Sequence, residues 1–163
     1  MLVFARRAIR VVTVLNWIAG AVIAGVIVIM LIARDRIRVS LVEEDIVGTG
    51  GYPWLIAALL LVLLVLPLAH AIFVRLHAIV LSADTDACLS DANADRLVVI
   101  AWCLVGINLI DVAFGVLDWK ANPAGDSEWL PSLTAWFAAL LLFVLAGVFR
   151  RGAAMRADLE GTI

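Results

Sequence analysis

Residues 54–74 read WLIAALLLVLLVLPLAHAIFV, a run without a single Asp, Glu, Lys or Arg. About 20 apolar residues in a helix are enough to cross the hydrocarbon of a bilayer. Inside lipid, a helix is the natural form for such a run because it pairs every backbone N–H and C=O within the segment. The run therefore predicts a transmembrane helix over about residues 54–76, with a kink at Pro67.

Similar apolar runs lie on both sides of this one. They predict further spans at about residues 11–33, 96–117 and 132–150, the last of them opening at Pro131. The first run follows several arginines, as a signal peptide does, but it is longer than the roughly 7–15 residues of a signal-peptide core. We therefore expect it to be a retained membrane anchor.

The composition of the whole chain agrees with four spans. Of its 163 residues, 65% are hydrophobic and 16% are charged, and the mean hydropathy is +1.11. A soluble domain is about half apolar, and a chain of this size has too much surface to hide such an excess from water. We predict an all-α membrane protein, a four-transmembrane-helix bundle that forms one domain over residues 1–163. Its helices should contact the lipid bilayer, which is thus one of its partners.

The basic residues predict the orientation of the spans. Eight of the 12 Lys and Arg residues lie at or beyond the span ends on the side of the two termini: Arg6, Arg7, Arg10, Arg75, Arg96, Arg150, Arg151 and Arg156. Positive charge near span ends favours the cytoplasmic side. Both termini, including the tail 151–163, should therefore be cytoplasmic in a bacterial inner membrane, although the basic group Arg34, Arg36 and Arg38 opposes this orientation.

The loop between the first two spans carries alternating apolar residues, Ile37, Val39 and Leu41, and ends in several glycines. Alternation followed by a glycine-rich turn is typical of a β-hairpin. We expect a small extracytoplasmic hairpin between helices 1 and 2.

Few polar residues lie within the predicted spans, and the candidates among them for a functional role are Asn16, His70, Asn108 and Asp111. Asn108 and Asp111 are three residues apart, so they share one face of a helix. Asp111 could serve as a proton or cation site, or it could make a structural hydrogen bond or be hydrated from the nearby loop. For Asn16 and His70 we expect hydrogen bonds between helices, and His70 has no second metal ligand at a suitable spacing.

No motif in the chain indicates catalysis. There is no G-x-S-x-G, H-E-x-x-H or P-loop sequence, and Cys88 and Cys103 form no C-x-x-C pair. No basic stretch indicates nucleic-acid binding. We expect no enzymatic activity, no cofactor, no metal and no direct contact with nucleic acid.

Two segments on the predicted cytoplasmic side are distinctive. In LSDANADRL, residues 89–97, Ser90 is placed to cap the third helix and Asn93 occupies the third helical position. The end of the chain, FRRGAAMRADLEGTI from residue 149, predicts a charged helical extension of the fourth span. These segments supply the candidates for interaction with a partner: Ser90, Asn93, Arg96, Arg150, Arg151, Arg156, Asp158 and Glu160.

The same two segments resemble the bacterial membrane-protein family called domain of unknown function 2975. The closing residues match its Phe-Arg-Arg-Gly and Met-Arg-x-Asp-Leu-Glu-Gly-Thr-Ile elements, and residues 89–97 are similar to its F-S-x-x-N-A-x-R-L step, with Leu89 in place of Phe. The resemblance implies a four-span, uncharacterised membrane protein. It also implies a small helix-turn-helix regulator, encoded nearby, as a partner, and it supplies no catalytic residues.

Two functions follow as hypotheses. The chain is a membrane scaffold, sensor or regulator that acts through its cytoplasmic loop and tail. Alternatively, it is a small transporter or channel that uses Asp111 and Asn108. Four short spans can form a transport pathway only through a cleft or with a partner copy, so the second hypothesis requires a cleft or a homo-oligomer.

Overall fold

The computed structural model describes residues 2–37, 51–82, 90–121 and 129–160, and all regular structure in these segments is helical. Each of the four long helices is apolar and long enough to cross a membrane, which confirms the predicted all-α, four-span fold. The helices have 28 to 32 residues. At 1.5 Å per residue they measure about 42–48 Å, so they extend beyond a hydrocarbon core of about 30 Å. They are α1 (Leu2–Ile32), α3 (Gly51–Ser82), α4 (Asp91–Ala121) and α5 (Leu133–Glu160).

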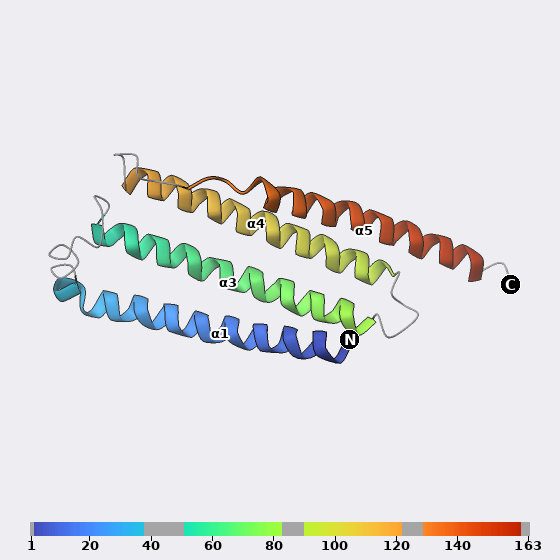
Figure 1. Ribbon diagram of the computed structural model, residues 1–163, viewed down its shortest axis with the longest axis horizontal. Helices are drawn as coiled ribbons and strands as arrows, with labels where there is room; N and C mark the ends of the chain where they lie inside the picture. The colour runs from blue at the N-terminus through green and yellow to red at the C-terminus, as the bar shows by residue number, and fades with distance from the viewer. Residues whose placement is uncertain (1, 38–50, 83–89, 122–128, 161–163) are drawn as a thin grey trace.

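The four helices lie side by side in chain order and form one layer (Figure 1). α1 packs on α3, α3 on α4, and α4 on α5, while within the described residues α1 reaches neither α4 nor α5. Successive helices run in opposite directions, so the start of α1, the end of α3, the start of α4 and the end of α5 lie at one end of the layer. We call this end the termini face, and the opposite end the far face.

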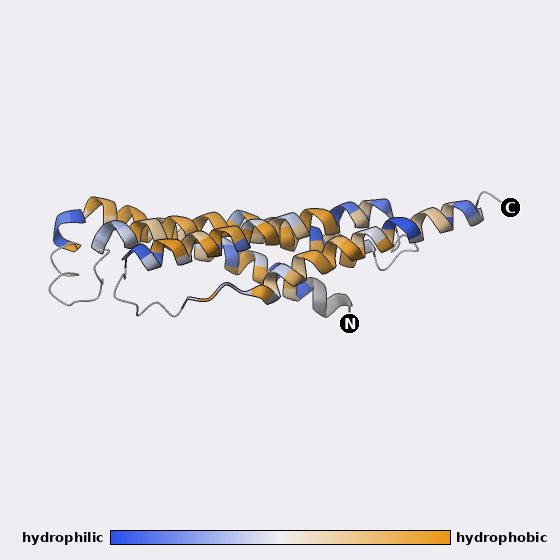
Figure 2. Cartoon of the chain, turned by 90° about the horizontal axis from the view of Figure 1, so that it is seen from above, coloured by the Kyte–Doolittle hydropathy of each residue, from blue (hydrophilic) through white to orange (hydrophobic). Residues whose placement is uncertain are grey.

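The helices bury little of their apolar surface against one another, so most of it is exposed on the outside of the layer. In the most apolar window of each helix, only 6% to 28% of the residues are buried. Apolar residues fill the middle of the layer and hydrophilic residues gather toward its ends (Figure 2). Exposing this much apolar surface to water would be strongly unfavourable, whereas lipid tails solvate it well. The chain is therefore a multi-pass membrane protein.

Two glycines let α1 and α4 approach α3 closely. A Cβ atom on Gly20 of α1 would lie 3.2 Å from Cδ1 of Leu66, and one on Gly106 of α4 would lie 3.1 Å from Cδ1 of Leu68. Small residues are common where helices meet in membranes because they bring the backbones together. α3 is thus held between α1 and α4 through close contacts at these two points.

The expected hairpin is not seen where the structure describes its start. A helical turn at residues 34–37 follows α1, and the amide of Ile37 donates to the carbonyl of Ala33 at 3.0 Å. A hydrogen bond four residues back along the chain is helical, so Ile37 is not in a strand. Val39 and Leu41, the rest of the predicted alternation, lie outside the described residues.

The proline expected to open the fourth span precedes the helix. α5 begins at Leu133, and the carbonyl of Ser132 accepts a hydrogen bond from the amide of Ala135 at 3.2 Å. Pro131 therefore lies before the first helical residues. Pro67, by contrast, is inside α3, which continues as one helix through it.

Candidate functional sites

Ser90 caps the N-terminus of α4, as the sequence predicts. Its hydroxyl oxygen accepts from the backbone amide of Asn93 at 3.3 Å. Its carbonyl accepts from the amides of Asn93 and Ala94, each at 3.1 Å. Because the first amides of a helix have no helical acceptor, this cap fixes where α4 begins on the termini face.

Asn93 is fully buried and links α4 to the end of α3. Its Nδ2 donates to the hydroxyl of Ser82 at 2.7 Å, and its Oδ1 accepts from Nη1 of Arg96 at 2.7 Å. The Ser82 hydroxyl in turn donates to the carbonyl of Ile79 at 2.7 Å. Of the predicted interaction candidates, Asn93 thus has its side chain inside the protein, where it holds two helices together.

An ion pair joins α5 to the same region of α4. Nη2 of Arg150 lies 2.8 Å from Oδ1 of Asp95, and both side chains are more than half exposed. The pair shows which residues of the two antiparallel helices lie opposite each other. α4 begins at Asp91, four residues before Asp95, so its first residue lies opposite about residue 154 of α5. The last turns of α5 therefore extend past the start of α4.

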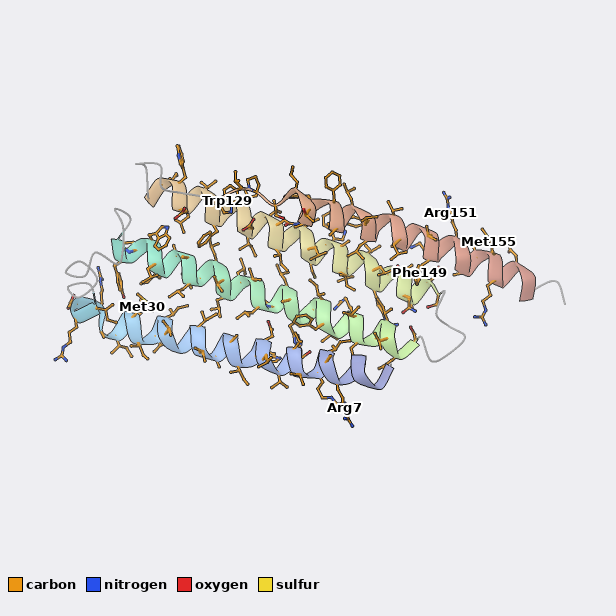
Figure 3. The ribbon with its side chains drawn as sticks, in the orientation of Figure 1. Arg7, Met30, Trp129, Phe149, Arg151 and Met155 are labelled. Carbon is orange, nitrogen blue, oxygen red and sulfur yellow. The ribbon has the colours of Figure 1, made fainter. Side chains whose placement is uncertain are left out.

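The extension of α5 beyond the apolar span is helical through Glu160, as predicted. Arg151 and Met155 lie on the side of α5 that faces away from α4, whereas Phe149 points toward α4 (Figure 3). Met155 is 65% exposed. The candidates Arg151, Arg156 and Asp158 are exposed as well, and the side chain of Glu160 lies outside the described part of the structure.

Asp111 has a partner that the sequence analysis did not identify. Its Oδ1 accepts from the indole Nε1 of Trp129 at 3.4 Å. The Trp129 ring lies directly on Gly115, where an added Cβ would come within 2.2 Å of the ring (Figure 3). Trp129 comes shortly before α5, so this contact connects that segment to the far half of α4.

Asn108 and Asp111 share a side of α4 but differ in their surroundings. Asn108 is buried, and its Nδ2 has no hydrogen-bond partner within the described residues. Asp111 is half-buried and borders a hollow of about 170 Å³ between α3 and α4. The other residues around this hollow are apolar: Leu61, Val62, Val65, Ile107, Ile110 and Phe114.

The other two intramembrane candidates, Asn16 and His70, meet in one groove of about 530 Å³ between α1 and α3. Asn16 Nδ2 donates to the carbonyl of Leu66 at 3.2 Å. The His70 ring packs edge-on against Trp17, with ring centroids 5.4 Å apart. Nδ1 of His70 is buried and has no hydrogen-bond partner within the described residues.

Comparison with known protein families identifies a match. A family model described as protein of unknown function (DUF2975) matches residues 43–163, which is most of the chain. The chain belongs to the DUF2975 family. The resemblance seen in the sequence is thereby confirmed, while no curated protein and no solved structure matches the chain.

The DUF2975 match contains most of the features described above. α3, α4 and α5 all fall inside it, so it includes the Asn93 network, the Asp95–Arg150 pair, the α5 extension and the Asp111–Trp129 contact. α1 precedes the matched segment. The groove that holds Asn16 and His70 is therefore built by one helix inside the DUF2975 match and one helix before it.

Proposed function

We propose that this DUF2975 protein is a membrane scaffold or regulator that docks a soluble protein on its termini face. The observation that carries the proposal is the length and register of α5. A helix needs about 20 residues to cross the hydrocarbon, whereas α5 has 28 and its last turns project past the start of α4. The residues of α5 that are not needed to cross the hydrocarbon lie on the termini face, where they can contact a partner outside the lipid (Figure 1).

The residue types on this extension suit a protein interface. Arg and Met are enriched in interfaces, and Arg151 and Met155 are four residues apart on one side of the helix. At the base of the extension Arg150 pairs with Asp95, close to the buried Asn93. A docking surface on a rigid helix loses less conformational freedom when a partner binds.

The charge distribution supports a cytoplasmic termini face. Eight of the 12 basic residues belong to the termini and the α3–α4 side, which is the cytoplasmic side under the positive-inside rule. The membrane in this proposal is the bacterial inner membrane. The partner is a small helix-turn-helix regulator, the class that the family resemblance implies, and it would contact DNA while this chain does not.

Site-specific photocrosslinking in living cells tests the proposal. A photoreactive residue at position 155 should form an adduct with a soluble protein, identified by mass spectrometry. The matched control is position 148, because Val148 is 56% exposed and lies two turns earlier on the same side of α5, within the apolar span. Position 148 should give lipid adducts only.

A charge reversal completes the test. Arg151→Glu should abolish the protein adduct at position 155 while the chain remains in the membrane fraction at its normal amount. The proposal is wrong if position 155 yields the same products as position 148, or if the adduct is unaffected by Arg151→Glu.

The transport hypothesis has one observation in its favour. Asp111 is half-buried beside an otherwise apolar hollow between α3 and α4, and intramembrane carboxylates often lie on ion pathways. Proteoliposomes containing the purified chain test it. Proton-coupled flux that disappears in Asp111→Asn but persists in Asp118→Asn, a change near the far end of α4, would favour transport over docking. Absence of flux in the unaltered protein would eliminate it.

A further inference from the structure

A second hollow extends the groove between α1 and α3 toward the termini face. It measures about 230 Å³, and Arg10, Thr13 and His77 are the polar residues that line it. The deeper hollow, of about 530 Å³, is lined mainly by apolar side chains together with Asn16 and His70. A volume of 530 Å³ is within the roughly 300–1,000 Å³ that small-molecule sites occupy.

The two hollows lie end to end on one side of the α1–α3 seam. The residues that line them recur every three or four positions, which places them in one stripe along each helix. On α1 the stripe contains Arg10, Thr13, Trp17 and Gly20, and on α3 it contains His77, Val74, His70, Pro67 and Leu63.

Polarity changes along this groove from its mouth to its depth. Arg10 is exposed at the mouth, immediately before the apolar run of α1, and His77 faces it from α3. The Thr13 hydroxyl donates to the carbonyl of Ile9 at 2.8 Å, so its proton is already used within α1. In the deeper hollow, Asn16 is likewise engaged, with Leu66. The groove therefore offers positive charge at headgroup depth and hydrocarbon-like walls below it.

We propose that an anionic phospholipid binds along the α1–α3 seam, with its phosphate at Arg10 and His77 and one acyl chain in the deeper hollow. Basic pockets between transmembrane helices are suited to anionic headgroups, because the lipid phosphate is attracted to a basic side chain while the acyl chain of the lipid stays in apolar surroundings. The occupant is a lipid rather than free phosphate, since the larger part of the groove is apolar. This site is separate from the proposed docking surface on α5.

Native mass spectrometry of the detergent-purified full chain, titrated with phosphatidylglycerol or phosphatidylcholine, tests the headgroup. Phosphatidylglycerol should be retained and phosphatidylcholine should not. Arg10→Gln should lower retention about fivefold, the effect of one basic charge near a lipid surface, and Arg10→Lys should preserve it. The matched control is Arg7→Gln, which should have no effect because Arg7 is on the same helix but points away from α3 (Figure 3).

A second pair of variants tests the acyl chain. Ala21 lines the deeper hollow, so Ala21→Phe should fill it and release phosphatidylglycerol even though Arg10 is intact. Ala19→Phe is the control, because Ala19 is exposed on α1 and lines neither hollow. Far-ultraviolet circular dichroism and gel filtration verify that each variant is folded.

Four outcomes would overturn the proposal. They are equal retention by Arg10→Gln and Arg7→Gln, equal retention by Ala21→Phe and Ala19→Phe, equal retention of the two lipids, and displacement of phosphatidylglycerol by excess inorganic phosphate. The last result would show that the site binds phosphate alone and that the acyl chain of the lipid does not contribute to binding.

Discussion

Asn93 of α4 donates a hydrogen bond to the hydroxyl of Ser82 of α3 across 2.7 Å, and so joins two helix ends on the termini face. The amide is completely buried in a layer whose helices otherwise expose most of their surface. A buried polar group is costly unless it is paired, and this one is bonded on both its nitrogen and its oxygen. Asp95, two residues after Asn93 in the same turn of α4, pairs with Arg150, so the buried amide lies close to the base of the α5 extension.

Replacing Asn93 should therefore destabilise the protein. Asn93→Ala deletes the buried amide that donates to Ser82 and accepts from Arg96. We expect the free energy of unfolding to fall by about 1–3 kcal/mol. Unfolding in mixed detergent micelles, followed by circular dichroism, measures it. Asp91→Asn is the control, because Asp91 is exposed in the same turn and should change stability by no more than about 0.5 kcal/mol. Equal effects of the two variants would mean that the buried amide is not a stabilising link.

Gly115 should be intolerant of any side chain while Trp129 is present. A Cβ there would be 2.2 Å from the indole, so Gly115→Ala must displace the ring and should cost about 1–3 kcal/mol through overpacking. In a Trp129→Ala background the same change should cost much less. A double-mutant cycle measures this difference. If Gly115→Ala costs the same in both backgrounds, the indole does not rest on Gly115 in the membrane.

The Asp95–Arg150 pair should contribute little to stability. Both side chains are more than half exposed, and exposed ion pairs are worth about 0–1 kcal/mol. The coupling from a cycle of Asp95→Ala and Arg150→Ala should lie in that range and decrease when salt is added. A coupling of several kcal/mol that is insensitive to salt would show that lipid or protein covers the pair.

The apolar runs and the local caps could be predicted from the sequence because each depends on neighbouring residues. The four spans follow from uninterrupted hydrophobicity, and Ser90 was recognisable as a cap from the residues just after it. The helical extension from Phe149 followed from its charged pattern in the same way. The helices are longer than the spans because polar residues outside the hydrocarbon remain helical, as at Asp91–Asp95.

Contacts between helices could not be predicted, because they depend on how the helices are arranged. Asn93 was a candidate for a partner, yet it faces Ser82, and nothing in residues 89–97 indicates where α3 ends. Asp111 was compared with Asn108 on its own helix, whereas its bond is to Trp129, across the α4–α5 connection. The single-layer order of the helices is likewise absent from any local pattern, although it is what creates the groove between α1 and α3.

The proposed docking function requires the termini face to lie in the cytoplasm, and cysteine accessibility measures this directly. In a background of Cys88→Ser and Cys103→Ala, single cysteines are introduced as Met155→Cys and Lys120→Cys, which are exposed positions at opposite ends of the layer. A membrane-impermeant maleimide should label Lys120→Cys in spheroplasts and Met155→Cys in inside-out vesicles only. Labelling of Met155→Cys in intact spheroplasts would contradict the proposed function, because the α5 extension would then face away from every cytoplasmic partner.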